Sequence, residues 1–181
     1  MQGPQAIIQF WFVDHGKQDW FGGKPEFDAE LAEAFGNLHP QIAAGEAWSW
    51  RVTPEGRLAE IVALDQFSRQ LHRGRAEAFA QDRMALALAQ EAISQGADDA
   101  VDRAWAAFFY LPFMHSESLV IQEEGVRLYT QHGDPDNLDF MLKHRDTIAR
   151  FGRFPFRNAA LGRQSTAEEL AYMREQGDRS F

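Results

Sequence analysis

Apolar side chains recur at helical spacing along this chain, and no segment alternates convincingly between apolar and polar residues. The clearest series is Leu31, Phe35, Leu38 and Ile42. Such spacing places side chains on one face of an α-helix, whereas a half-buried strand needs a period of two. The sequence therefore predicts an all-α fold of about eight helices, whose short connecting loops favour antiparallel pairs. No clean repeat of fixed length is visible, so periodicity alone does not establish a regular solenoid.

Proline, glycine and capping residues mark where the helices are expected to begin and end. Thr53 and Asp134 each precede a proline, which suits the first turn of a helix. Ser165 and Thr166 stand three residues before glutamates, which gives two overlapping capping boxes. Helices are predicted over residues 4–13, 28–42, 54–71, 76–94, 98–111, 116–131, 135–152 and 166–176. Further N-caps are expected at Asp28, Asp98–Asp99 and Ser116. Helices are expected to end at Gly96, Gly133 and Gly152, and one is expected to end before Pro112. Residues 48–50 are expected in a turn or a short strand-like piece.

Length and composition limit the class of protein. A chain of 181 residues with 45% hydrophobic residues can bury a sizeable core, and we expect one helical domain over residues 1–181. The absence of cysteine excludes disulfides and thiolate metal sites, and it suits a cytoplasmic protein. The longest apolar run, residues 104–114, contains a proline and is shorter than the ~18 residues that a membrane span needs. The net charge of -9 argues against non-specific nucleic-acid binding.

One basic segment runs against this acidic background. Residues 143–163 carry a single acid, Asp146, and six cations, which are Lys143, Arg145, Arg150, Arg153, Arg157 and Arg163. Phenylalanines alternate with the arginines between Gly152 and Arg157, and their rings favour burial. A local cationic loop on an acidic protein indicates that an anion binds there, or that internal carboxylates pair there.

Several polar residues fall on the apolar faces of predicted helices. Arg145 lies at the centre of the stripe in residues 135–152, and His144 lies at its edge. Asp65 and Arg69 share the apolar face of residues 54–71 in the favourable acid-first order. His115 aligns with the apolar stripe of the helix that follows Pro112. We therefore expect Asp65 and Arg145 to be mostly buried and each to have a partner, because a buried charge is costly without one.

These residues can be interpreted either as structural or as part of a functional site. Asp65 and Arg69 can form a purely structural pair, His115 can be a satisfied core histidine, and the loop arginines can be solvated. In the functional interpretation, Arg153, Arg157 and Arg163 hold one anion together with the helix N-terminus at Ser165–Thr166. His115, His144 and at least one of Arg69, Arg153 and Arg157 are then expected to converge.

Metal-dependent and nucleophilic chemistry have weaker support. His115, Glu117 and His144 are of the types that bind a metal, but His115 and Glu117 are two apart and face different ways on a helix. Ser116 lacks a nucleophile-elbow motif, and no glycine-rich phosphate loop is present. We expect no metal and no cofactor.

Several strings of residues along this chain resemble motifs of the bacterial family DUF924. The resemblance covers nearly the whole length and lies in FWF at 10–12, LDQFSR at 64–69, YLPFMHSE at 110–117, HR at 144–145, RFGRFP at 150–155, RN at 157–158, LGR at 161–163, ST at 165–166 and EE at 168–169. It implies an all-α, tetratricopeptide-like superhelix and no established activity. Two positions depart from the family pattern, since Ser68 stands where proline is usual and Phe156 where histidine is usual. The second departure counts against catalysis.

Three functional hypotheses follow. The first is a binding module whose concave face holds a small anionic molecule or an acidic peptide terminus. The alternatives are an enzyme on a small anionic substrate, with histidine as acid or base and arginine as clamp, and an adaptor that meets another protein through exposed aromatics. The candidate ligand-binding residues are Asp65, Arg69, His115, His144, Arg145, Arg153, Arg157, Asn158 and Arg163.

Overall fold

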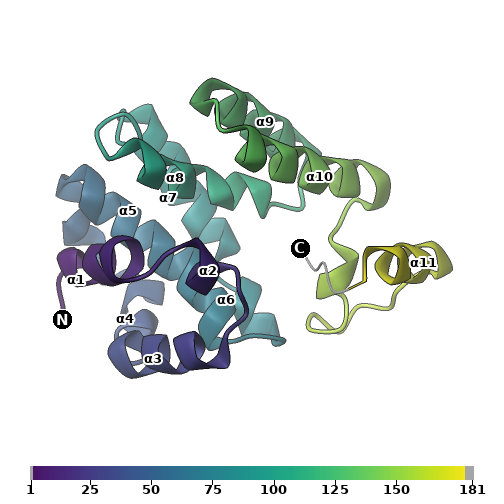
Figure 1. Cartoon of the computed structure of the whole chain (residues 1–181), viewed down its shortest axis with the longest axis horizontal. Helices are drawn as coiled ribbons and strands as arrows, with labels where there is room; N and C mark the ends of the chain where they lie inside the picture. The colour runs from purple at the N-terminus through teal and green to yellow at the C-terminus, as the bar shows by residue number, and fades with distance from the viewer. Residues whose placement is uncertain (1, 178–181) are drawn as a thin grey trace. The chain divides into compact units, whose positions relative to one another are not determined.

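The computed structural model describes residues 2–177, which form helices and turns without a strand (Figure 1). This confirms the predicted all-α class. The chain separates into two compact units. Unit 1 comprises Met1–Arg73 and Glu77–Pro112, and unit 2 comprises Gly74–Ala76 and Phe113–Phe181. The single domain and the tetratricopeptide-like superhelix stay predictions.

Unit 1 contains most of the helices that the structure describes. They are α1 (Pro4–Ile8), the π-helix η1 (Gln9–Asp14), α2 (Lys17–Trp20), α3 (Pro25–Phe35), α4 (His39–Ala43), the 3-10 helix η2 (Trp48–Val52), α5 (Pro54–Val62), the π-helix η3 (Ala63–Phe67), α6 (Ser68–Leu71) and α7 (Asp82–Ser94). The 3-10 helix η4 (Ala76–Phe79) and α8 (Arg103–Met114) each span a boundary between the units. None of the described helices is long and apolar enough to cross a lipid bilayer.

The core of unit 1 is built on the continuous helical segment formed by α5, η3 and α6. Every residue from Leu58 to Ser68 is buried. Thr53 begins this segment as predicted, because its Oγ1 accepts a hydrogen bond from the Gly56 backbone N–H at 3.1 Å. Trp11 is fully buried beside this segment and contacts the rings of Trp20, Phe27, Phe67 and Phe108. Unit 1 is thus an aromatic core around one almost wholly buried helix.

Unit 2 contains α9 (Leu119–His132), α10 (Pro135–Phe151), the 3-10 helix η5 (Pro155–Arg157) and α11 (Ala167–Gln176). The predicted antiparallel pairing is seen in α9 and α10, which lie side by side and are joined at Gly133, with φ 78° (Figure 1). Close approach of this pair depends on Gly125. A Cβ there would stand 2.7 Å from the Met141 sulfur and 3.2 Å from the Phe113 Cβ.

Some predicted helix boundaries are wrong. The helix α3 starts at Pro25, so Asp28 lies in its first turn and is not the N-cap. Asp102 caps α8 in place of Asp98–Asp99, since it accepts from the Ala104 N–H at 2.8 Å. The same helix continues through Pro112, because a proline in the last turn removes only one backbone hydrogen bond. Ser118, not Ser116, precedes α9, and residues 48–50 are helical.

Candidate functional site

A carboxylate and an arginine from distant parts of unit 2 hold the loop between α10 and α11. Glu117 accepts hydrogen bonds from Arg163 Nη1 at 2.7 Å and Nη2 at 2.9 Å, and from the Phe154 N–H at 2.8 Å. The Phe154 carbonyl accepts from Arg163 Nη2 at 3.1 Å. Burial acts to raise the pKa of Glu117, but the bonds from Arg163 and Phe154 outweigh it and the pKa is lowered. Both backbone polar groups of Phe154 are therefore tied to one ion pair.

A second ion pair joins the same loop to the start of α11. Arg153 donates to Glu169 Oε1 at 2.6 Å and to Oε2 at 2.9 Å. Glu169 also accepts from the Thr166 N–H at 2.7 Å, which completes the predicted capping box. The hydrogen bonds from Arg153 are the main reason that the pKa of Glu169 falls to about 2. Asn158 links the two ion pairs, because its amide nitrogen is 3.4 Å from Glu169 Oε2 and its Oδ1 accepts from Arg163 at 3.0 Å.

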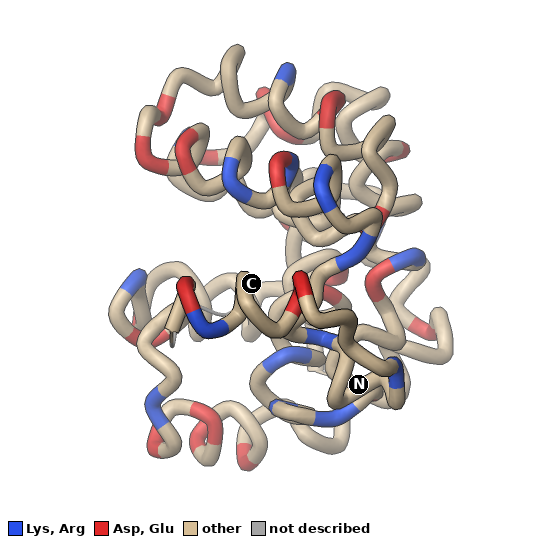
Figure 2. The backbone as a smooth tube through the Cα atoms, turned by 90° about the vertical axis from the view of Figure 1, so that its right-hand side faces the viewer, with Lys and Arg blue, Asp and Glu red and all other residues tan. Residues whose placement is uncertain are grey.

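Arg153 and Arg163 thus form ion pairs with carboxylates of the same unit. Basic and acidic positions are interspersed along the backbone in Figure 2, and Arg150 also pairs with Glu168 at 2.9 Å. Of the two explanations offered for the basic segment, internal pairing accounts for these three arginines. The helix N-terminus at Thr166 carries the Glu169 carboxylate at the place suggested for an external anion.

Arg157 lies differently from the other loop arginines. It is 4% exposed, and its guanidinium carbon is 4.5 Å from the centroid of the buried Phe154 ring. The His144 ring meets the same phenylalanine at 5.6 Å in an edge-on contact, and the His115 ring is 6.4 Å from that of His144. We call His115, His144, Phe154 and Arg157 the Arg157 cluster. It brings together three of the residues expected to converge.

The face of α10 that is buried differs from the predicted one. Arg145 was expected at its centre and mostly buried, but its side chain is 29% exposed and pairs with the exposed Asp146 at 2.7 Å and Glu123 at 3.3 Å. His144, predicted at the edge, is 6% exposed. His144 Nδ1 and Thr147 Oγ1 each bond to a carbonyl of their own helix, at 2.7 Å and 2.9 Å, which lowers the cost of burying these residues.

Asp65 and Arg69 lie in unit 1, on η3 and α6. Asp65 is 1% exposed, as predicted, and its Oδ1 is 3.1 Å from Arg69 Nη1. Asp82 accepts two further hydrogen bonds from Arg69, at 2.9 and 3.1 Å. Burial acts to lower the pKa of Arg69, but the charges of Asp65 and Asp82 raise it. The candidate residues are therefore divided between two units, with Asp65 and Arg69 in one and the other seven in the second.

The sequence pointed to the arginines of unit 2 but not to the carboxylates that pair with them. Glu117 was weighed only as a metal ligand and Glu169 only as a cap, although each has a second role as the counter-ion of an arginine. The buried His39, whose Nε2 is 2.8 Å from Ser68 Oγ, was not singled out either. Among residues 2–177, no three His, Asp or Glu side chains are grouped as metal ligands.

Comparison with known proteins gives the same family that the sequence motifs resemble. The family model described as bacterial protein of unknown function (DUF924) matches residues 7–177. The solved structure of a protein of unknown function from Agrobacterium tumefaciens is 38% identical in sequence, covers 95% of this chain and 97% of its own, and superposes with a TM-score of 0.91. The comparison with curated proteins gave no match. The chain belongs to the DUF924 family.

Proposed function

We propose that unit 2 binds a small anionic molecule or an acidic peptide terminus through the Arg157 cluster. The observation that carries this proposal is the burial of Arg157 against the Phe154 ring, which the His144 ring also contacts, with the His115 ring 6.4 Å from that of His144. Arginine recognises carboxylate and phosphate oxygens through two parallel N–H···O bonds, and stacking on an aromatic ring fixes the plane of its guanidinium. The low dielectric around it strengthens each such bond.

Arg153 and Arg163 have a supporting role in this proposal. An external anion at either one would have to displace Glu169 or Glu117, each of which makes two hydrogen bonds to its arginine. Instead, these ion pairs fix the backbone on both sides of Phe154 and so fix the ring that carries Arg157. Preorganisation of this kind lowers the entropy cost of binding.

The two histidines bring polar ring nitrogens to the Arg157 cluster. His144 Nδ1 is 2.7 Å from the Phe140 carbonyl, which can only accept, so Nδ1 carries a proton. His115 is half-buried beside His144. A ligand with both an anionic and a hydroxyl group suits this combination.

The proposal is tested by a thermal-shift screen of carboxylated and phosphorylated metabolites and of acidic peptides. A ligand at about 100 times its dissociation constant adds roughly 2.7 kcal/mol to stability and is therefore detectable. Hits are then titrated calorimetrically into wild type, Arg157→Gln and the matched control Arg150→Gln, whose side chain is half exposed. Loss of a charge-assisted bond predicts at least about tenfold weaker binding for the first variant and no change for the control.

Two outcomes would contradict the proposal. Equal weakening in both variants would mean that long-range charge, and not a defined site, attracts the ligand. A hit that binds Arg157→Gln as well as wild type would place the site elsewhere. His115→Gln, at a half-buried position, serves as a second variant if Arg157→Gln does not fold, and it is expected to weaken binding as well.

A further inference from the structure

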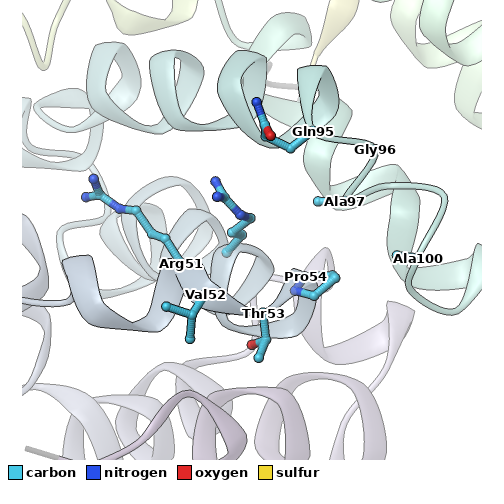
Figure 3. A pocket seen from close by; sticks show the side chains of 9 residues that line it. Arg51, Val52, Thr53, Pro54, Gln95, Gly96, Ala97 and Ala100 are labelled. Carbon is cyan, nitrogen blue, oxygen red and sulfur yellow. The ribbon is translucent and has the colours of Figure 1, made fainter.

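Unit 1 contains a pocket that none of the sequence motifs pointed to. It has a volume of about 230 Å³ and lies between the end of η2, the start of α5 and the residues that follow α7. Figure 3 shows Val52, Thr53 and Pro54 on one side and Gln95, Gly96 and Ala97 on the other. Two arginines, Arg51 and Arg57, and one further alanine, Ala100, complete the lining. No carboxylate belongs to this lining, and we call it the Arg51–Arg57 pocket.

The walls of the pocket are set by close backbone packing. Gly56 lets η2 lie directly against the start of α5, because a Cβ there would be 2.0 Å from the Trp50 carbonyl oxygen. On the opposite side, Gly96 has φ +71° and turns the chain sharply after α7. A Cβ at Gly96 would meet no atom within 4 Å. The opening therefore lies between the tightly packed junction of η2 with α5 and the turn at Gly96.

Each of the two arginines pairs with a carboxylate, which is buried for Arg51 and exposed for Arg57. Glu60 is 1% exposed and accepts from Arg51 Nε at 2.7 Å and from Nη2 at 2.6 Å. Arg57 donates from Nη1 to Glu91. A guanidinium has five N–H donors, so these pairs engage only one edge of each group. An arginine oriented by a buried acid can offer its remaining donors to a second anion.

The remaining lining selects the kind of anion. Arg51 and Arg57 are balanced by Glu60 and Glu91, so the local charge is near zero and a singly charged ligand is accommodated better than a doubly charged one. Val52, Pro54, Ala97 and Ala100 give the rest of the wall short apolar side chains. We infer that the Arg51–Arg57 pocket binds a small organic monocarboxylate with a short hydrocarbon portion, whose carboxylate meets the arginines.

This site is separate from the Arg157 cluster. All of its lining residues belong to unit 1, whereas the Arg157 cluster belongs to unit 2. The inference therefore does not depend on the proposed function, and each can fail without the other. A variant at Arg157 is expected to leave binding in the Arg51–Arg57 pocket unchanged.

The test uses isobutyrate as the probe and isobutyramide as its neutral counterpart of the same shape. Titrated into the ¹⁵N-labelled full chain, isobutyrate should shift the amide signals of Thr53, Gly96 and Ala97. Isobutyramide and inorganic phosphate should each bind at least about tenfold more weakly, since the first lacks the charge and the second carries more of it and no hydrocarbon.

Variants locate the binding. Ala100 is exposed at the rim, so Ala100→Phe should fold normally and fill the opening, and Arg57→Gln should remove one set of donors. Each is expected to weaken isobutyrate binding by about tenfold or more. Arg73→Gln, which breaks an exposed ion pair with Asp28 in the same unit, should have no effect. Isobutyramide binding as tightly as isobutyrate, or unchanged binding in Ala100→Phe, would overturn the inference.

Discussion

The buried histidine of unit 1 makes the stability of the protein depend on pH in a defined range. His39 is 5% exposed, and its Nε2 donates to Ser68 Oγ, because that hydroxyl already donates to the Leu64 carbonyl at 2.6 Å. Burial, with a smaller contribution from the charge of His72, lowers the pKa of His39 from 6.5 to about 4. The folded protein thus keeps this ring neutral where the unfolded chain would protonate it.

The sign and size of the effect follow from proton linkage. Below the unfolded pKa the unfolded chain binds one more proton than the folded protein, so the free energy of unfolding falls as pH decreases from 6.5 towards 4. At about pH 5 the loss attributable to His39 is about 2 kcal/mol relative to about pH 7.5. For a chain of this length that corresponds to a melting temperature lower by about 4–8 °C.

Urea unfolding followed by tryptophan fluorescence at the two pH values measures this loss. His39→Gln keeps a donor for Ser68 but cannot titrate. Between about pH 7.5 and about pH 5, its free energy of unfolding should therefore fall by about 2 kcal/mol less than that of wild type. Ser68→Ala should be less stable at both pH values, yet it should retain the pH dependence, since burial is the main cause of the shift. Equal losses in wild type and His39→Gln would refute the reasoning.

Three further predictions concern stability and are read from the same urea experiment near neutral pH. Gly56→Ala should cost about 1–3 kcal/mol, because the added Cβ would clash with the Trp50 carbonyl, and an unchanged midpoint would contradict this. Glu117→Gln should cost about 1–2 kcal/mol, because Arg163 loses its charged acceptor, and Arg163→Gln in the same background should add little. Thr166→Ala should cost about 1 kcal/mol through the loss of the N-cap of α11, whereas Thr166→Ser should be close to wild type.

The sequence alone determined the features that depend on neighbours along the chain. Helical spacing of apolar residues predicted the all-α class, and capping chemistry predicted the starts of helices at Thr53, Asp134 and Thr166. Helix ends at Gly96, Gly133 and Gly152 were predicted for the same reason, and all three glycines have a positive φ. These features succeed because a cap and its helix lie within four residues, so the interaction that decides the structure is visible in the sequence.

The tertiary structure decided which charges meet. Arg163 and Glu117 are 46 residues apart, and nothing in the spacing of either residue selects the other. The face of α10 is a similar case, since Arg145 has the central position for a helix with one apolar stripe. In the folded unit α10 contacts α9 and also α11, where Thr147 meets the Tyr172 hydroxyl at 2.9 Å. Packing on two sides buries a different arc of the helix, and only the placement of the neighbouring helices reveals which arc that is.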